Sequence, residues 1–402
     1  MNRDIPTSEN PFVRVGTTLY KIVSQPRLNG GHIKKRIVWN NETLRQDYGK
    51  DYLADVPKYD GFCTVPDHVN YCQVIDNFLN LYEPIGHEPN EGDFSHIQTL
   101  VRHIFGEQYE LGMDYLQLLY LQPVQKLPIL LLVSEERNTG KSTFLNFLKA
   151  VFRNNVTFNT NEDFRSQFNA DWTGKLVIVV DEVLLNRRED SERLKNLSTT
   201  LSYKVEAKGK DRDEIAFFAK FVLCSNNESL PVIIDPGEIR YWVRKIYRLE
   251  SDDTNFLQKL TAEIPAFLYF LQHRKLTTRQ ESRMWFSPKL TETPALQRII
   301  RCNRGKHEVE AMELIREIMD NMEIESFSFC LNDLLNLLNL SGVKIEKHQL
   351  RRIVTESWKL TPAPNGLTYT SYQFAYNKER RFAPIKRVGR FYTVSRTLLD
   401  EL

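Results

Sequence analysis

The stretch PILLLVSEERNTGKSTFLNFL, residues 128–148, decides the fold. It opens with PILLLVS (128–134), an apolar run of the length typical of a buried strand. A polar turn follows, and TFLNFLKAVF then has the spacing of a helix. A strand, a turn that ends in GKS and a helix form the context of a phosphate-binding loop. In such a loop, backbone N–H groups and the helix N-terminus bind phosphate.

Each residue type in this turn suits that chemistry. Gly140 allows close approach of the phosphates, Lys141 neutralises them, and Ser142 ligates magnesium. The usual first glycine is replaced by Glu135, whose negative side chain is expected to point away from the phosphates. The alternative is a chance GKST sequence at the start of an ordinary helix. The predicted nucleotide-binding residues are Asn138, Thr139, Gly140, Lys141, Ser142 and Thr143.

Two further apolar runs end in polar residues. KLVIVVDE (175–182) ends in Asp181, which would hold Mg²⁺ together with Ser142, and in Glu182, which would orient and activate water. AKFVLCSN (219–226) ends in Asn226, which would sense the terminal phosphate. The alternatives are acids that merely cap a strand and an asparagine in a turn. The cofactors implied are ATP and Mg²⁺.

Strands alternate with helices through this region, and RYWVRKIYRL (240–249) is a possible fourth strand. The pattern predicts an α/β fold with a mainly parallel sheet in three layers. Residues 1–92 predict a small mixed accessory module, and residues 93–300 a helical collar followed by the ATPase core. Residues 301–402 carry three amphipathic helix candidates and then a β-rich tail, which suggests a winged-helix domain.

Composition limits the cellular setting. The five cysteines are scattered without a CxxC pair, which argues against a disulfide framework or a structural zinc site. No apolar run reaches the roughly 18 residues of a membrane helix, and the first residues lack the apolar core of a signal peptide. We therefore expect a reducing cytoplasm and no membrane partner.

Local charge points to nucleic acid where the near-balanced total does not. Residues 344–396 contain twelve basic and three acidic residues, interleaved with aromatic ones. In a winged helix, the helix of residues 347–359 would enter a DNA groove, and the wing of residues 378–390 would touch the backbone. The alternative is that the aromatic residues form the core and the charges only confer solubility. The predicted DNA-binding residues here are Arg351, Arg352, Arg380, Arg381, Lys386 and Arg387.

These motifs together resemble a known family. NTGKS (138–142), KVEAKGKDRDEIAFFAKFVLCSN (204–226) and DPGEIRYWVRKI (235–246) resemble the corresponding segments of superfamily 3 helicases. The wider pattern is similar to the helicase portion of phage and plasmid primase-helicases. No acidic primase constellation precedes residue 128, so a separate primase or polymerase polypeptide would supply priming.

The resemblance implies a ring, usually a hexamer, of AAA+ subunits with ATP between neighbours. One neighbour would supply an arginine to the site, Arg240 as first candidate and Arg244 as second; either could instead pair with a surface acid. A hairpin would face the central pore and grip the phosphates of single-stranded DNA, although a solvated charged turn is the alternative. Its predicted DNA-binding residues are Lys204, Lys208, Lys210 and Arg212.

The leading hypothesis is an ATP-dependent replicative DNA helicase of a phage or mobile element, acting in the bacterial host cytoplasm, with 3′-to-5′ polarity carried over from the family. A second hypothesis, motivated by Glu135, is an ATP-binding origin-recognition or replication scaffold without motor activity. A third is a small-molecule kinase with a phosphate-binding loop, which would need a lid and an acceptor pocket that the sequence does not reveal.

Overall fold

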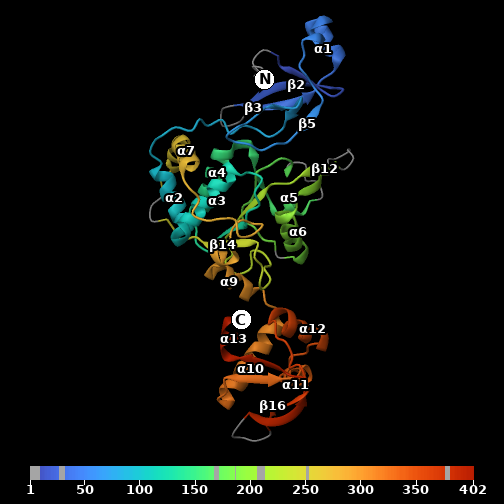
Figure 1. Cartoon of the computed structure of the whole chain (residues 1–402), viewed down its shortest axis with the longest axis vertical. Helices are drawn as coiled ribbons and strands as arrows, with labels where there is room; N and C mark the ends of the chain where they lie inside the picture. Colours follow the sequence, from blue (N-terminus) through green and yellow to red (C-terminus); the bar gives the residue numbers. More distant parts are fainter. Residues whose placement is uncertain are drawn as a thin grey trace. The chain divides into compact units, whose positions relative to one another are not determined.

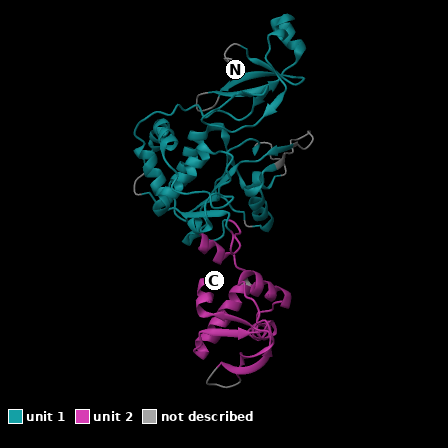
Figure 2. Cartoon of the chain, viewed as in Figure 1, with its two compact units in different colours: residues 1–231, 239–295 teal, residues 232–238, 296–402 magenta. Residues whose placement is uncertain are grey.

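The computed structural model describes residues 10–26, 32–166, 172–185, 187–205, 213–249, 253–375 and 381–402. The chain divides into two compact units (Figures 1 and 2). The first comprises residues 1–231 and 239–295, and the second comprises residues 232–238 and 296–402. In the described residues, no helix is both long and apolar enough to span a membrane.

The first unit begins with a module of short strands. Its main sheet has the order β3-β2-β1-β4, formed by Phe12–Val15 (β1), Thr18–Pro26 (β2), His32–Val38 (β3) and Lys58–Tyr59 (β4). A smaller sheet has the order β5-β7-β6, from Gly61–Cys63 (β5), Val74–Ile75 (β6) and Phe78–Asn80 (β7). Helix α1 (Asn41–Tyr48) and the 3-10 turn η1 (Asp51–Ala54) pack Leu44 and Leu53 against Phe12.

A five-stranded parallel sheet forms the core of the first unit. Its order is β14-β8-β13-β10-β9, and every neighbouring pair is parallel. Four of its strands are buried along nearly their whole length, as the continuous apolar runs predict. The strands are Ile129–Val133 (β8), Val156–Asn159 (β9), Val177–Val180 (β10), Lys220–Ser225 (β13) and Tyr241–Lys245 (β14).

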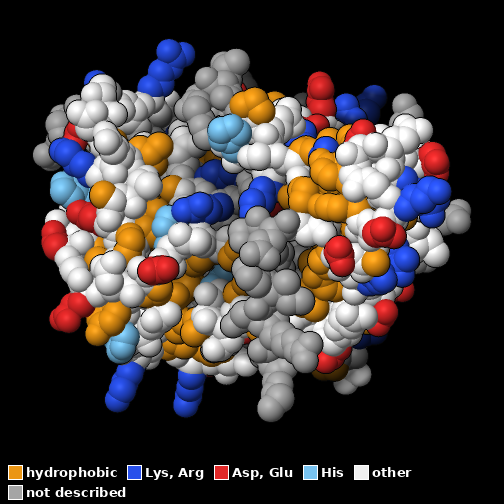
Figure 3. Space-filling model, turned by 90° about the horizontal axis from the view of Figure 1, so that it is seen from above, with side chains coloured by type: hydrophobic (Ala, Val, Ile, Leu, Met, Phe, Trp, Pro, Cys, Tyr) orange, Lys and Arg blue, Asp and Glu red, His pale blue; other side chains and the backbone are white. Residues whose placement is uncertain are grey.

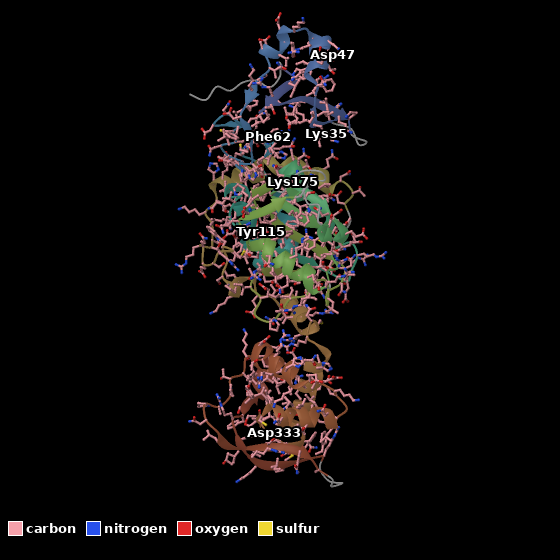
Figure 4. All side chains as sticks on the ribbon, turned by 90° about the vertical axis from the view of Figure 1, so that its right-hand side faces the viewer. Lys35, Asp47, Phe62, Tyr115, Lys175 and Asp333 are labelled. Carbon is pink, nitrogen blue, oxygen red and sulfur yellow. The ribbon has the colours of Figure 1, made fainter. Side chains whose placement is uncertain are left out.

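Helices cover both faces of this sheet, so the core has three layers. One face packs against four helices (Figure 1): Ser95–Phe105 (α2), Tyr109–Leu121 (α3), Lys141–Phe152 (α4) and Phe256–His273 (α7). Tyr115 of α3 is fully buried there (Figure 4). On the opposite face, Phe164 of α5 (Asn161–Arg165) packs edge-on against Phe221 of β13, and α6 (Arg188–Thr199) lies on the same side in Figure 1.

Shorter elements complete the first unit. The antiparallel pair β11 (Ser202–Val205) and β12 (Asp213–Ala216) forms the predicted hairpin, whose turn lies outside the described residues. The 3-10 turns η2 (Gly106–Gln108) and η3 (Arg153–Asn155) follow α2 and α4, and α8 spans Pro288–Thr291. Helix α9 (Pro294–Cys302) spans the boundary between the two units.

The second unit has its own apolar core. Its chain order is helix, strand, two helices and a β hairpin, followed by a strand that pairs back with the first one. The elements are α10 (Lys306–Met322), β15 (Ser326–Phe329), α11 (Leu331–Leu340), α12 (Lys347–Arg352), the π-helical segment η5 (Ile353–Ser357), β16 (Leu367–Phe374), β17 (Phe382–Gly389), β18 (Tyr392–Ser395) and α13 (Arg396–Glu401).

The second unit adds one detail to the sequence prediction and differs from it in another. Residues 382–389, which lie within the predicted wing, form the strand β17, and all eight of them are in register with β16. The helix predicted over residues 347–359 is regular only to Arg352 and then widens into η5, which ends at Ser357. Lys386 and Arg387 are therefore strand residues.

Candidate nucleotide-binding site

The turn between β8 and α4 has the backbone of a phosphate-binding loop. Gly140 is the N-cap of α4 and has a φ of +78°, a left-handed conformation that glycine adopts readily. A Cβ at this position would make only ordinary van der Waals contacts, 3.4 Å from Leu249 and 3.7 Å from His103, so the backbone conformation and not the space favours glycine. Asn138 has a φ of +55°. The helix therefore begins with its N–H groups directed at the turn.

Lys141 is buried at the first position of α4, and its ammonium lies 3.4 Å from the carbonyl oxygen of Ser134, to which it donates. Burial lowers the pKa of Lys141, while the nearby groups of Cys224, Asp181 and Glu228 oppose that shift. The ammonium is thus turned back onto its own loop, which is a position from which it can reach an anion at the helix start.

The predicted magnesium ligands lie together. The Ser142 hydroxyl donates to Asp181 Oδ2 at 3.3 Å, although the two residues are 39 positions apart in the sequence. They meet because β10 ends at Val180 and the carboxyl ends of parallel strands share one edge of the sheet. A hydroxyl and a carboxylate are ligands that Mg²⁺ prefers, so this pair fits the ion.

Glu182 follows Asp181 in a left-handed backbone conformation, with a φ of +54°, and is exposed. This conformation is uncommon for a residue with a side chain. Asn161 holds the backbone here, because its amide donates to the Glu182 carbonyl at 3.1 Å and its carbonyl accepts the Leu184 amide at 2.9 Å. The turn after β10 is therefore fixed from α5.

Asn226 lies just past the end of β13 and is exposed. The strand end is tied to the turn after β10 by two hydrogen bonds: the Val183 amide donates to the Cys224 carbonyl at 2.7 Å, and the Ser225 hydroxyl donates to the Val183 carbonyl at 2.9 Å. The structure therefore brings Asn226 to the same sheet edge as Asp181 and Glu182.

Three contacts restrain the phosphate-binding loop from outside. His103 of α2 contacts the Thr139 carbonyl at 3.0 Å, and the Leu249 amide donates to the Asn138 carbonyl at 3.0 Å. The carboxylate of Glu136 accepts the backbone amide of Arg248 at 3.0 Å. Glu136 is thereby engaged with the segment after β14. Thr143, in the first turn of α4, is partly buried.

Glu228 is a site residue that the sequence analysis missed. Only 3% of its surface is exposed, and its carboxylate accepts the Glu135 amide at 3.1 Å and pairs with Lys245 of β14 at 2.9 Å. A charged residue three positions after a strand is typical of an exposed turn, so the sequence does not predict that Glu228 is buried. Its contacts join the segment after β13 to the first residue of the loop and to β14.

The two candidate arginines have different surroundings. Arg244 of β14 is buried and pairs with Glu107 at 2.7 Å within the same chain, and it also donates to Gln108 at 2.8 Å. Arg240 precedes β14 and is partly buried, and its carbonyl accepts the Ile129 amide at 2.8 Å. Arg244 therefore pairs with an acid of its own chain, which is the alternative to a role in a neighbour's site that the sequence left open.

The predicted DNA-binding residues fall in two places. Lys208, Lys210 and Arg212 lie outside the described residues, as does the side chain of Lys204 on β11. In the second unit Arg380 also lies outside them, while Arg351 and Lys386 are exposed.

Three other predicted DNA-binding cations of the second unit have acidic partners. Arg352 pairs with Glu356 at 3.3 Å, Arg387 pairs with Asp333 (labelled in Figure 4) at 3.2 Å, and Arg381 pairs with Glu317. Because these pairs neutralise part of the basic charge, Arg351 and Lys386 are the described candidates whose charge is most available to a partner.

Comparisons with known proteins place the fold. The apo structure of the NrS-1 C-terminal region (305–718) matches with a TM-score of 0.63 and 16% identity, over 95% of this chain and 96% of that one. An A-form apo structure of the same region matches with a TM-score of 0.62 and 16% identity, over 94% and 95%. The chain therefore shares the mixed α/β fold of that region, parallel sheet included.

Three other comparisons give no further information on the fold or the function. A JCV helicase bound to a small molecule gives a TM-score of 0.31 at 14% identity, over 56% of this chain and 66% of that one, a score too low to show a shared fold. Residues 132–240 match the model of a family of unknown function, DUF5906. A search of the curated proteins gave no match.

Proposed function

We propose that this protein is an ATP-driven DNA motor, a replicative helicase of a phage or mobile element. The observation that carries the proposal is the meeting of Lys141, Ser142 and Asp181 at the carboxyl edge of one parallel sheet. Glu182 and Asn226 belong to the turns at the same edge. A lysine, a magnesium-type ligand pair, an acid and an amide in this arrangement are what nucleoside triphosphate hydrolysis requires.

Each residue has a role in that chemistry. Lys141 and the N–H groups around Gly140 bind the phosphates, and Ser142 and Asp181 hold Mg²⁺, which would neutralise the phosphate oxygens. Glu182 accepts a proton from the attacking water. Asn226 positions that water, while the partly buried Thr143 and the loop residues Asn138 and Thr139 complete the turn.

The proposal includes a ring of subunits, with an arginine supplied by the neighbour. Arg240 stays the first candidate, as the order of the motif suggests, and the buried Arg244, which pairs with the exposed Glu107 of its own chain, is the second. The carboxyl edge of the sheet, which Asp181 borders, is open to a neighbouring subunit. Glu182 and Asn226 are both exposed there, so a side chain of the neighbour can approach them.

DNA binding is assigned to two elements. The β11–β12 hairpin would grip one strand in the pore through Lys204, Lys208, Lys210 and Arg212. The second unit would act as a winged helix, with the exposed Arg351 on α12 and Lys386 on β17 making contacts to the DNA backbone.

Lys141→Ala tests the motor. We expect ATP turnover stimulated by single-stranded DNA, and unwinding of a forked duplex, to fall by at least about 100-fold, since an electrostatic phosphate contact in the transition state is lost. Lys289→Ala, a change of an exposed lysine in the same unit, should leave both activities intact. Unwinding that persists in Lys141→Ala would refute the motor.

A second candidate function is an ATP-binding replication scaffold without turnover, favoured by one observation, the glutamate at position 135. Turnover measured with and without single-stranded DNA separates the two. Nucleotide binding without any stimulated hydrolysis in the unchanged protein would support the scaffold.

A further inference from the structure

Charge is sharply segregated in the N-terminal module. Residues 42–92 contain ten acidic and three basic residues, whereas residues 10–41 contain no acidic residue and six basic ones. The six are Arg14, Lys21, Arg27, Lys34, Lys35 and Arg36. The basic stretch coincides with strands β1, β2 and β3. This segregation gives one sheet of the module a basic character that the whole chain lacks.

The outer half of the β2–β3 pair extends past the rest of its sheet. Strand β1 pairs with β2 only over residues 18–21, and the Ile22 amide makes one further bond to Pro11. Beyond that point, β2 pairs only with β3 in the described part of the sheet, from Ile22 opposite Arg36 to Pro26 opposite His32. We call residues 22–26 and 32–36 the basic ribbon.

The basic ribbon is exposed on both faces toward its end. Ser24 and Gln25 of β2 are exposed, and so are Lys34 and Lys35 of β3. Because neighbouring residues of a strand point to opposite faces, Lys34 and Lys35 present an ammonium on each side of the ribbon. Neither lysine has an ion-pair partner among the residues that the structure describes. Figure 3 looks onto this end of the molecule and shows lysine and arginine side chains at its surface.

The base of the ribbon is firmly held. Arg36 lies over the ring of Phe62 at 5.5 Å, and Phe62 packs edge-on against Tyr20 at 5.6 Å. On the opposite face, Lys21 lies over the ring of Trp39 at 4.4 Å. Lys35 and Phe62 are both labelled in Figure 4. These contacts fix the direction in which the ribbon leaves the sheet.

Lysines on an edge strand often serve only to prevent edge-to-edge aggregation. That role needs one or two cations, and it does not account for a 32-residue stretch without an acid next to an acidic segment. A single-stranded nucleic acid would need exposed aromatic rings for stacking. The aromatic side chains near the ribbon, Tyr20, Trp39 and Phe62, are instead partly buried in packed clusters.

We propose that the basic ribbon binds duplex DNA. A two-stranded β ribbon has the dimensions of the major groove, and cations on both of its faces can reach the phosphates of both strands. Lys34 and Lys35 make those contacts, and the binding is electrostatic and independent of sequence. It needs no ATP hydrolysis, so it is separate from the motor proposed above.

The test uses the full-length chain without nucleotide and a labelled duplex of about two helical turns. The double variant Lys34→Gln/Lys35→Gln is compared with Lys50→Gln/Lys58→Gln, which changes two exposed lysines elsewhere in the module. Fluorescence anisotropy is measured over a series of salt concentrations. We expect the ribbon variant to lower the slope of log affinity against log salt by about 1.8, since each phosphate contact contributes about 0.9. The control should keep the original slope.

Two further readouts complete the test. A single strand of equal length should lose less affinity than the duplex, and duplex DNA should protect Lys34 and Lys35, but not Lys50 and Lys58, from amine acetylation. An unchanged salt slope with unprotected ribbon lysines would overturn the proposal. So would an equal loss in the control variant, or a larger loss on single-stranded DNA than on the duplex.

Discussion

The carboxylate of Glu228 accepts a hydrogen bond from the backbone amide of Glu135 at 3.1 Å. Glu135 stands where a phosphate-binding loop usually has glycine, and it is absent from the residues that adopt a positive φ, which in this loop are Asn138 and Gly140. Position 135 therefore does not need glycine for its backbone conformation. The loop start is held by the buried carboxylate, which is in turn paired with Lys245.

Glu228→Ala should destabilise the protein and weaken nucleotide binding. It removes the carboxylate that accepts the Glu135 amide and pairs with the half-exposed Lys245 ammonium, and losing such an acceptor costs about 2 kcal/mol in the free energy of unfolding. Glu228→Gln keeps an acceptor and should cost less. Urea unfolding and the KM for ATP measure the two effects, and KM should change more than kcat. Glu42→Ala, which breaks the exposed pair with Arg45, should cost under about 1 kcal/mol; equal costs would contradict our assignment.

Asp181→Asn and Glu182→Gln should separate binding from hydrolysis. The first removes a charge that the Ser142 hydroxyl contacts, so we expect the Mg²⁺ dependence of nucleotide binding to weaken. The second removes the proton acceptor, so binding should persist while turnover falls by about 100-fold or more. A fluorescent ATP analogue and a turnover assay report the two quantities. Identical behaviour of both variants would argue against the separate roles.

The variants Arg240→Ala and Arg244→Ala should lose function for different reasons, the first through ATP turnover and the second through stability. If Arg240 acts on a neighbour's site, mixing Arg240→Ala chains with Lys141→Ala chains should restore part of the turnover that each lacks alone, because some interfaces then combine both intact residues. Arg244→Ala should lower stability by about 2 kcal/mol through the lost bonds to Glu107 and Gln108. Absence of complementation would remove Arg240 from the proposal.

His68 should make stability depend on pH. Its ring contacts the Tyr82 hydroxyl at 2.6 Å and the Tyr120 carbonyl at 2.7 Å, and burial lowers its pKa to about 4. Between pH 6.5 and 4 the unfolded chain binds a proton that the folded chain does not, so stability falls as the pH falls. By pH 5 the loss is about 2 kcal/mol.

His68→Gln removes this titration, so the difference in unfolding free energy between pH 7 and pH 5 should shrink by that amount. Urea denaturation at the two pH values measures it. His348→Gln, at an exposed position, serves as the control and should retain the dependence of the unchanged protein. A dependence that survives in His68→Gln would exclude His68 as its origin.

Much of the core sheet could be predicted from the sequence, because buried parallel strands are continuous apolar runs. The proximity of Ser142 to Asp181 also follows from the sequence, since the ends of such strands share one edge. Strand β9 was not predicted: VTFN is only four residues long, and Phe158 is exposed at the edge of the sheet. A short edge strand has no distinctive pattern before its neighbour is known.

Other features depend on tertiary contacts that spacing cannot reveal. β17 contains Pro384 and the two exposed cations Lys386 and Arg387, a composition typical of a turn, yet full pairing with β16 makes it a strand. The burial of Glu228 follows from its partners at positions 135 and 245, which are distant in sequence. Arg244 has the position expected of a neighbour's arginine, and only the structure shows Glu107 beside it.

The replacement at position 135 also bears on how related chains are recognised. A sequence motif that requires glycine at the first position of the loop fails to detect any protein whose turn is held by a carboxylate distant in sequence. A broader pattern, free at that position but requiring an acid shortly after β13 and a lysine on β14, would select chains built this way. Such an acid and lysine should then change together among relatives that regain the glycine.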